Sequence, residues 1–160
     1  MNKHIRPLNM EDLPYLEAMN TGIEDDYVIR VFKRISSGTN RMYGLFWDDQ
    51  LVSVGGYSIF ARSYAMLGRM RSDLRYRSND LSTQLMSHVI QEVFKLPEIQ
   101  WVGANTQEEN SPARRVLAKL GLSEHSTLFG ATTQDVSMLS NGRRPWREVE
   151  SLESKKQWLD

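Results

Sequence analysis

The sequence lacks cysteine, a net charge and any long apolar run. With no cysteine among its 160 residues, it has no disulfides, thiolate metal sites or cysteine nucleophile. Lysine and arginine total 20, as do aspartate and glutamate, so the chain lacks the net positive charge that would indicate nucleic acid as a partner. No segment approaches the roughly 20 apolar residues of a membrane span, and the N-terminus has no apolar run typical of a signal peptide. We therefore expect a cytoplasmic protein that binds neither nucleic acid nor membrane.

The remaining composition is that of an ordinary globular domain. Hydrophobic residues make up 40% and charged residues 25% of the chain, and domains usually run to roughly 100–200 residues. Three histidines, His4, His88 and His125, show no ligand spacing, so we expect no metal site. The sequence predicts one domain over residues 1–160, with a C-terminal extension at about 134–160.

Apolar periodicity and turn residues predict the order of the elements. The order is a strand, two helices, a meander of three strands, a long helix, a strand and a last helix. We expect strands at residues 5–8, 42–47, 51–60, 64–72 and 99–104. Helices are expected to open at residues 9–12, to run from 25 or 26 to 35, to span 81–95, and to follow residue 110.

The last predicted helix carries the most specific pattern. Asn110 or Ser111 can cap its start, Pro112 suits its first turn and Gly121 can end it. The text from Asn110 onward reads Asn-x-x-Ala-(x)5-Lys-Leu-Gly and continues with an apolar residue. This pattern resembles the last helix of the GNAT superfamily of N-acetyltransferases, and the order of elements agrees over about residues 4–130. The resemblance implies an α/β (α+β) fold, with a central mixed, mostly antiparallel sheet of six to seven strands flanked by about four helices.

The resemblance also points to a loop that would hold coenzyme A. In the superfamily, a loop of the form Arg/Gln-x-x-Gly-x-Gly/Ala precedes the long helix and binds the pyrophosphate. Here Arg77 takes the first position, Asp80 that of the first glycine and Ser82 that of the second. The Asp80 carboxylate either faces the pyrophosphate and repels it, or turns outward and caps the helix, a role that Asn79 also suits.

Acetyl-CoA is the co-substrate that the resemblance implies. Its pantetheine arm would pair with the backbone of the fourth strand. The residues expected to bind the cofactor are Met70, Arg71 and Ser72 on that strand, Arg77, Ser78, Asn79, Asp80, Leu81, Ser82 and Thr83 in the loop and helix start, and Asn105 and Asn110 beside the pantetheine.

The resemblance leaves the catalytic residues unassigned. Many members carry a tyrosine seven residues after the Asn of the last helix, as the proton donor to the leaving thiolate, and here that position is Leu117. A base is needed to keep the amine neutral. Tyr57, Glu108, Glu109 and His125 are candidates, but each also suits a surface or packing role. The run from Glu24 to Asp26 either attracts a cationic amine or is a solvated helix start.

Two functions follow from these patterns. The first is an N-acyltransferase that moves an acetyl group from acetyl-CoA to a primary amine of a small molecule or peptide, by direct attack in a ternary complex. The alternative is a catalytically weak or inactive GNAT-fold module that binds a ligand or regulates.

The C-terminal extension is predicted separately. Residues 135–139 are expected to form either a last strand or a short helix. Trp146, Val149, Leu152 and Trp158 are spaced as in an amphipathic helix. Such a helix would dock on its own domain or on a second subunit, so a homodimer is one outcome.

Overall fold

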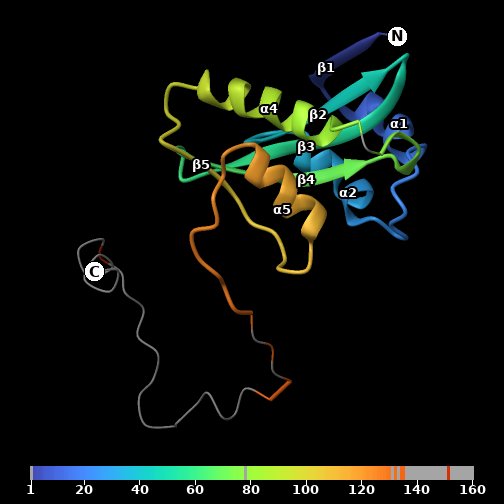
Figure 1. Ribbon diagram of the computed structural model, residues 1–160. Helices are drawn as coiled ribbons and strands as arrows, with labels where there is room; N and C mark the ends of the chain where they lie inside the picture. The colour runs from blue at the N-terminus through green and yellow to red at the C-terminus, as the bar shows by residue number, and fades with distance from the viewer. Residues whose placement is uncertain (1, 78, 131, 133, 136–150, 152–160) are drawn as a thin grey trace. The chain divides into compact units, whose positions relative to one another are not determined.

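The structure is a computed structural model that describes residues 2–77, 79–130, 132, 134–135 and 151 (Figure 1). Two compact units divide the chain, Met1–Glu124 and His125–Asp160. All the elements given below belong to the first unit. The strand or helix expected at residues 135–139 and the amphipathic helix after it lie almost wholly outside the described residues. The predicted division into a single domain with an extension stays a prediction.

A mixed sheet forms the centre of the first unit. Its described strands are β1 (Lys3–Pro7), β2 (Asn40–Trp47), β3 (Gln50–Phe60), β4 (Tyr64–Ser72) and β5 (Trp101–Ala104), and they lie side by side in chain order. Every neighbouring pair is antiparallel except β4 and β5, which are parallel. The predicted fold class is therefore confirmed. The described part of the sheet has five strands, rather than the six to seven expected.

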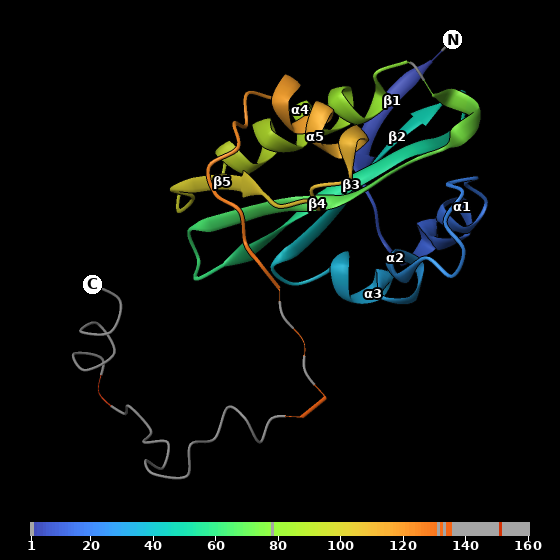
Figure 2. The same cartoon turned by 60° about the horizontal axis from the view of Figure 1, so that its bottom comes forward.

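Helices cover both faces of the sheet. The structure has the short 3-10 turns η1 (Met10–Asp12) and η2 (Leu74–Tyr76), and the helices α1 (Leu13–Glu17), α2 (Tyr27–Arg30), α3 (Phe32–Ile35), α4 (Leu81–Phe94) and α5 (Ser111–Lys119). Figure 2 shows α4 and α5 on one face and α1, α2 and α3 on the other. Each face has its own buried core, around Leu85 and Val89 under α4 and around Val28 and Phe32 under the short helices.

Local details of the structure differ from the sequence prediction or decide between its alternatives. The helix expected from residue 25 or 26 to 35 is two short helices, because Val31 (φ −104°, ψ 10°) leaves the helical region between them. The last helix is capped by Asn110, whose Oδ1 accepts the Ala113 amide at 3.2 Å, and not by Ser111. The fifth strand begins at Trp101 instead of residue 99.

Candidate functional site

The two parallel strands, β4 and β5, separate halfway along β4. Their pairing runs from Tyr64 opposite Trp101 to Leu67 opposite Ala104, where β5 ends. β4 continues for five more residues, from Gly68 to Ser72, which pair with β3 on the other side. In the part of the chain that the structure describes, this half of β4 has no strand on its β5 side. Its outer edge can therefore pair with an extended ligand, as an edge strand does.

A bulge in β4 marks the point of separation. Between two paired positions, Val54 with Arg71 and Gly56 with Gly68, β3 has one residue while β4 has two. The first of the two, Arg69, adopts φ 59°, which is uncommon for a residue with a side chain. A bulge bends its strand and redirects the side chains around it. The sequence analysis did not identify this bulge, although a glycine inside a strand is a known signal for one.

Gly68 lies at the same place, and the free space beside its Cα is called the open point below. A Cβ built on Gly68 meets no atom within 4 Å, whereas one on its partner Gly56 would lie 2.0 Å from the Arg41 carbonyl oxygen. Paired residues share a face of the sheet, and Met42, the partner of Gly56 on β2, packs in the core that α2 and α3 cover. The open point therefore belongs to that face. Sequence analysis missed Gly68 as a site residue.

The helix α4 begins at the loop predicted to bind pyrophosphate. Asp80 is its N-cap residue, in the left-handed conformation (φ 56°, ψ 27°). That conformation is the physical reason for a glycine at this position, because glycine adopts positive φ without steric cost. Aspartate is among the few other residues that tolerate it.

The Asp80 carboxylate neither caps α4 nor remains an unpaired negative charge. It makes no capping bond to a backbone amide. Instead it accepts the Thr83 hydroxyl at 2.8 Å and the Lys119 ammonium of α5 at 2.7 Å. The hydrogen bond from Lys119, and then that from Thr83, lower the pKa of the Asp80 carboxyl. The negative charge is therefore paired with a cation at the start of α4, which reduces its repulsion of an anion.

A chain of serine hydroxyls fixes α4 on the end of β4. Ser82 Oγ lies 2.6 Å from Ser72 Oγ, which lies 3.2 Å from Ser53 Oγ. Two predicted cofactor residues, Ser72 and Ser82, are thus in direct contact. Asn79 stabilises the loop by an internal hydrogen bond, in which its Nδ2 donates to the Tyr76 carbonyl oxygen at 3.0 Å. Arg77 is exposed beside them, and Ser78 lies outside the described residues.

Asp73 connects this loop to the opposite side of the fold. Its buried carboxylate accepts the Asn20 amide at 3.0 Å and the Arg75 amide at 2.9 Å, and it pairs with the Arg75 guanidinium at 2.5 Å. The hydrogen bonds from the Arg75 side chain are the largest influence and lower the pKa of Asp73 to about 2, against the effect of burial. Asp73 thereby holds the end of β4 against the segment that joins α1 to α2.

Met70 and Arg71 point to opposite faces of the sheet. Met70 packs on the core under α4. Arg71 turns toward α2, where its Nε and Nη2 donate to the two Asp26 oxygens at 2.6 and 2.8 Å. Burial alone would raise the pKa of Asp26, but the hydrogen bonds, first from Arg71 and then from the Val28 amide, lower it. The Arg71 side chain is therefore engaged, and only its backbone remains for the predicted pantetheine contact.

Two of the three carboxylates of the acidic run before α2 are paired. Asp25 pairs with Arg30, and Asp26 pairs with Arg71, whereas Glu24 is exposed and belongs to no ion pair among the described residues. The expectation that this run attracts a cationic amine stays a prediction, and Glu24 is the carboxylate left for it. Asp26 also caps α2, accepting the Val28 amide at 3.0 Å, which is the helix-start role that the sequence left open.

The two asparagines lie after β5 and before α5. Asn105 is exposed immediately beyond the last residue of β5, where the two strands separate. Asn110 uses its Oδ1 to cap α5. On the same helix, Leu117 is 9% exposed and provides no proton donor at the position of the family's tyrosine. Lys119, at the end of α5, brings that end to Asp80 at the start of α4.

The structure places the candidate bases in different surroundings, and their role stays a prediction. Burial raises the pKa of Tyr57 and raises that of Tyr43, its neighbour, to about 12, so both phenols stay protonated at neutral pH. Glu108 and Glu109 are exposed in a turn. His88, which lies on α4, packs edge-on against Tyr43, with ring centroids 5.8 Å apart. His125 belongs to the second unit.

Neither a metal centre nor a membrane helix is found in the described part of the chain. The residues that the structure describes contain no group of three His, Asp or Glu residues placed to hold a metal ion. None of the described helices is long and apolar enough to cross a bilayer.

Comparison with known proteins identifies the family. The family model described as "Acetyltransferase (GNAT) family" matches residues 5–122, most of the chain. The chain belongs to the GNAT family of acetyltransferases. A search of curated protein sequences gave no match.

Solved structures of this family share the fold. AAC(6')-Iy, in complex with the bisubstrate analogue CoA-S-monomethyl-acetylneamine, superposes with a TM-score of 0.67 at 16% identity, over 84% of this chain and 100% of that one. The ribosomal-protein-S18-alanine N-acetyltransferase from Escherichia coli gives 0.67 at 17%, over 78% and 80%. A putative acetyltransferase from Agrobacterium tumefaciens str. C58 gives 0.66 at 15%, over 81% and 99%. Identities this low establish the likeness of the fold alone.

Proposed function

We propose that this GNAT protein is an N-acetyltransferase that moves the acetyl group of acetyl-CoA to a primary amine of a small molecule or peptide. The observation that carries the proposal is the edge of β4 from Gly68 to Ser72, which β5 leaves open beside the start of α4. Family membership supports it. So do the complexes of AAC(6')-Iy with CoA and with a bisubstrate analogue, which are similar in fold.

The residues present fit coenzyme A. The open edge of β4 supplies backbone groups at Met70 to Ser72 for the amides of the pantetheine arm. The start of α4 supplies the unpaired amides that favour a phosphate at a helix N-terminus, and Arg77 adds a positive charge next to them. Asp80 does not oppose this arrangement, because Lys119 compensates its charge. Asn105 and Asn110 are proposed to contact the pantetheine from the β5 side.

Direct transfer needs little covalent participation by the protein. The amine nitrogen attacks the thioester carbonyl carbon, the N–C bond forms, the C–S bond breaks and coenzyme A leaves as a thiolate. The amine loses a proton and the thiolate gains one. With Leu117 in place of a tyrosine, we propose that solvent protonates the thiolate. Holding both reactants together in one complex removes much of the entropic barrier.

A second candidate function is a GNAT-fold module that binds a ligand without efficient catalysis. Two observations favour it. Leu117 cannot donate a proton, and the loop glycine is replaced by Asp80, whose carboxylate links α4 to α5 through Lys119. The first feature removes the usual proton donor and the second removes the usual loop glycine, while the fold is kept.

Calorimetric titration with acetyl-CoA and with CoA, followed by an acyl-transfer assay over a panel of amines, separates the two functions. The enzyme is expected to bind acetyl-CoA in the micromolar range and to release free thiol only when an amine is present. Binding without thiol release would favour the module, and no binding of either ligand would remove the enzyme. Arg77→Gln should weaken binding, whereas Arg62→Gln, in the turn at the far end of β4, is the matched control and should not.

A further inference from the structure

Arg69 has an unusual position on the face that α2 and α3 cover. The bulge places its side chain there, next to the open point at Gly68. Its Nη2 donates to Ser58 Oγ at 2.7 Å and lies 3.5 Å from Asn40 Oδ1. The side chain is half-buried, and no ion pair among the described residues includes it.

Two other arginines on this face have carboxylate partners. Arg71 pairs with Asp26, and Arg30 pairs with Asp25. For Arg69, burial lowers the pKa of the guanidinium, Tyr27 raises it by a smaller amount, and the charge of Arg34 lowers it by a smaller amount still. Arginine nevertheless stays charged in proteins. A half-buried guanidinium without a carboxylate partner carries a cost in stability that an anion would relieve.

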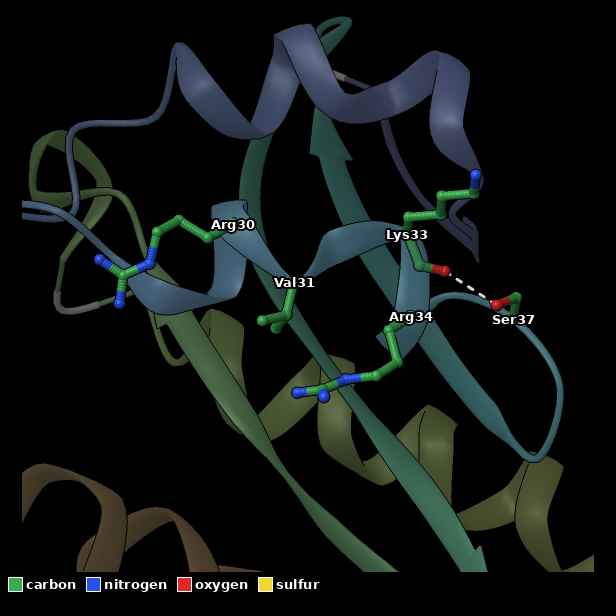
Figure 3. Close-up of a pocket in the computed structure, with 5 residues that line it drawn as sticks. All are labelled: Arg30, Val31, Lys33, Arg34 and Ser37. Carbon is green, nitrogen blue, oxygen red and sulfur yellow. Dashed lines mark hydrogen bonds between the residues drawn. The ribbon is translucent and has the colours of Figure 1, made fainter.

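Arg34 lies on α3 and adds a second cation without a partner in the described residues. It lines a shallow hollow together with Arg30, Val31, Lys33 and Ser37. Figure 3 shows that Arg34 and Val31 project to one side of the α2–α3 segment, while Lys33 extends to the opposite side. Asn40 joins the two residues, since its Nδ2 donates to the Arg34 carbonyl oxygen at 3.2 Å and its Oδ1 lies 3.5 Å from Arg69 Nη2.

We propose that Arg69, assisted by Arg34, binds a carboxylate of the acceptor, so that the acceptor is an amino-acid-like small molecule with both an amine and a carboxylate. This inference rests on the proposed acetyltransferase function. The hydrogen bonds of Arg69 to Ser58 and Asn40 use only its Nη2. Its Nη1 is left to donate to a carboxylate, and such charge-assisted bonds are among the stronger ones in proteins. The open point at Gly68 then leaves room for the amine to approach the edge of β4.

The test compares amino acids with the amines that lack only the carboxylate: lysine with cadaverine, ornithine with putrescine, histidine with histamine and tyrosine with tyramine. Each ligand is titrated calorimetrically into the protein alone and into its complex with CoA, so that the readout needs no turnover. In at least one pair, the amino acid should bind the wild-type protein about tenfold to a hundredfold more tightly, as charge-assisted hydrogen bonds predict.

Arg69→Gln removes the charge at similar length, and Arg62→Gln is the matched control away from this face. Arg69→Gln should abolish the advantage of the amino acid and leave the binding of its amine within twofold, while Arg62→Gln should change neither. The inference is overturned if every amine binds at least as tightly as its amino acid, or if Arg69→Gln weakens both members of a pair equally. Thiol release is measured separately. Its absence, with carboxylate binding retained, would overturn the proposed transferase and leave the carboxylate site standing.

Discussion

Gly68 and Gly56 form a matched pair that tests the open point on β4. They are register partners on the same face of the sheet, but their surroundings differ. A Cβ at Gly68 meets nothing within 4 Å, so Gly68→Ala should leave the free energy of unfolding unchanged or raise it by about 0.5 kcal/mol, because alanine restricts the unfolded chain. A Cβ at Gly56 would lie 2.0 Å from the Arg41 oxygen and 2.9 Å from its carbon. Gly56→Ala should therefore cost about 2 kcal/mol or more.

The functional consequence is expected only at Gly68. The larger Gly68→Val fills the space beside the outer half of β4 with a residue that strands favour. We expect normal stability, acetyl-CoA affinity within about threefold of wild type, and a fall in kcat/KM for the amine of about tenfold, which corresponds to about 1.4 kcal/mol of lost transition-state stabilisation.

Urea denaturation and steady-state kinetics measure these effects. Two results would refute the reasoning. If Gly68→Ala destabilises as much as Gly56→Ala, the space beside Gly68 is not open. If Gly68→Val is stable and as active as wild type, the acceptor does not approach along this part of β4.

Three further predictions concern Asp73, Asp80 and Leu117. The pKa of Asp73 is lowered to about 2 from 3.8, so its contribution to stability is complete above the unfolded value and is lost as the pH falls toward 2. Asp73→Asn should therefore cost about 2 kcal/mol in urea denaturation at pH 7, and the difference from wild type should shrink between pH 4 and pH 2; a difference that does not depend on pH would contradict this origin. Asp80→Gly should tighten CoA binding severalfold in calorimetry, since it frees the Lys119 ammonium, and the gain should fade in high salt; weaker binding would show that the Asp80–Lys119 link organises the loop. Leu117→Tyr should raise turnover by up to about a hundredfold, because it supplies a proton donor; unchanged turnover in a folded variant would show that thiolate departure is not the slow step.

Local patterns were enough to predict most of the fold. β4 was predicted at residues 64–72, where the structure has it, because this segment contains apolar residues and is flanked by turns. The predicted strands at residues 42–47 and 51–60 imply a tight turn between them, and Asp48 and Asp49 in this turn both adopt positive φ in the structure. Gly121 ends the last helix region with φ 79°, as a left-handed stop residue should. These features depend on neighbours a few residues away, which a sequence shows directly.

Contacts between residues that are far apart in the sequence could not be predicted from it. Lys119 meets Asp80 across 39 positions, and Asp73 holds Asn20 across 53. These contacts decide whether a charged residue is free to bind a ligand. The loop residue Asp80 was identified as critical, but its partner was not. The unpaired Arg69 could not be found either, because its position depends on a bulge that is defined by the pairing of two strands.

Amide hydrogen exchange followed by NMR, with and without acetyl-CoA, tests the central claim most directly. The account places acetyl-CoA along the open edge of β4 and at the start of α4. Acetyl-CoA should therefore protect amides among residues 70–72 and 81–83, and leave those of the β3–β4 turn at residues 61–63 unchanged. Binding that protects neither segment, or no binding at all, would contradict the account.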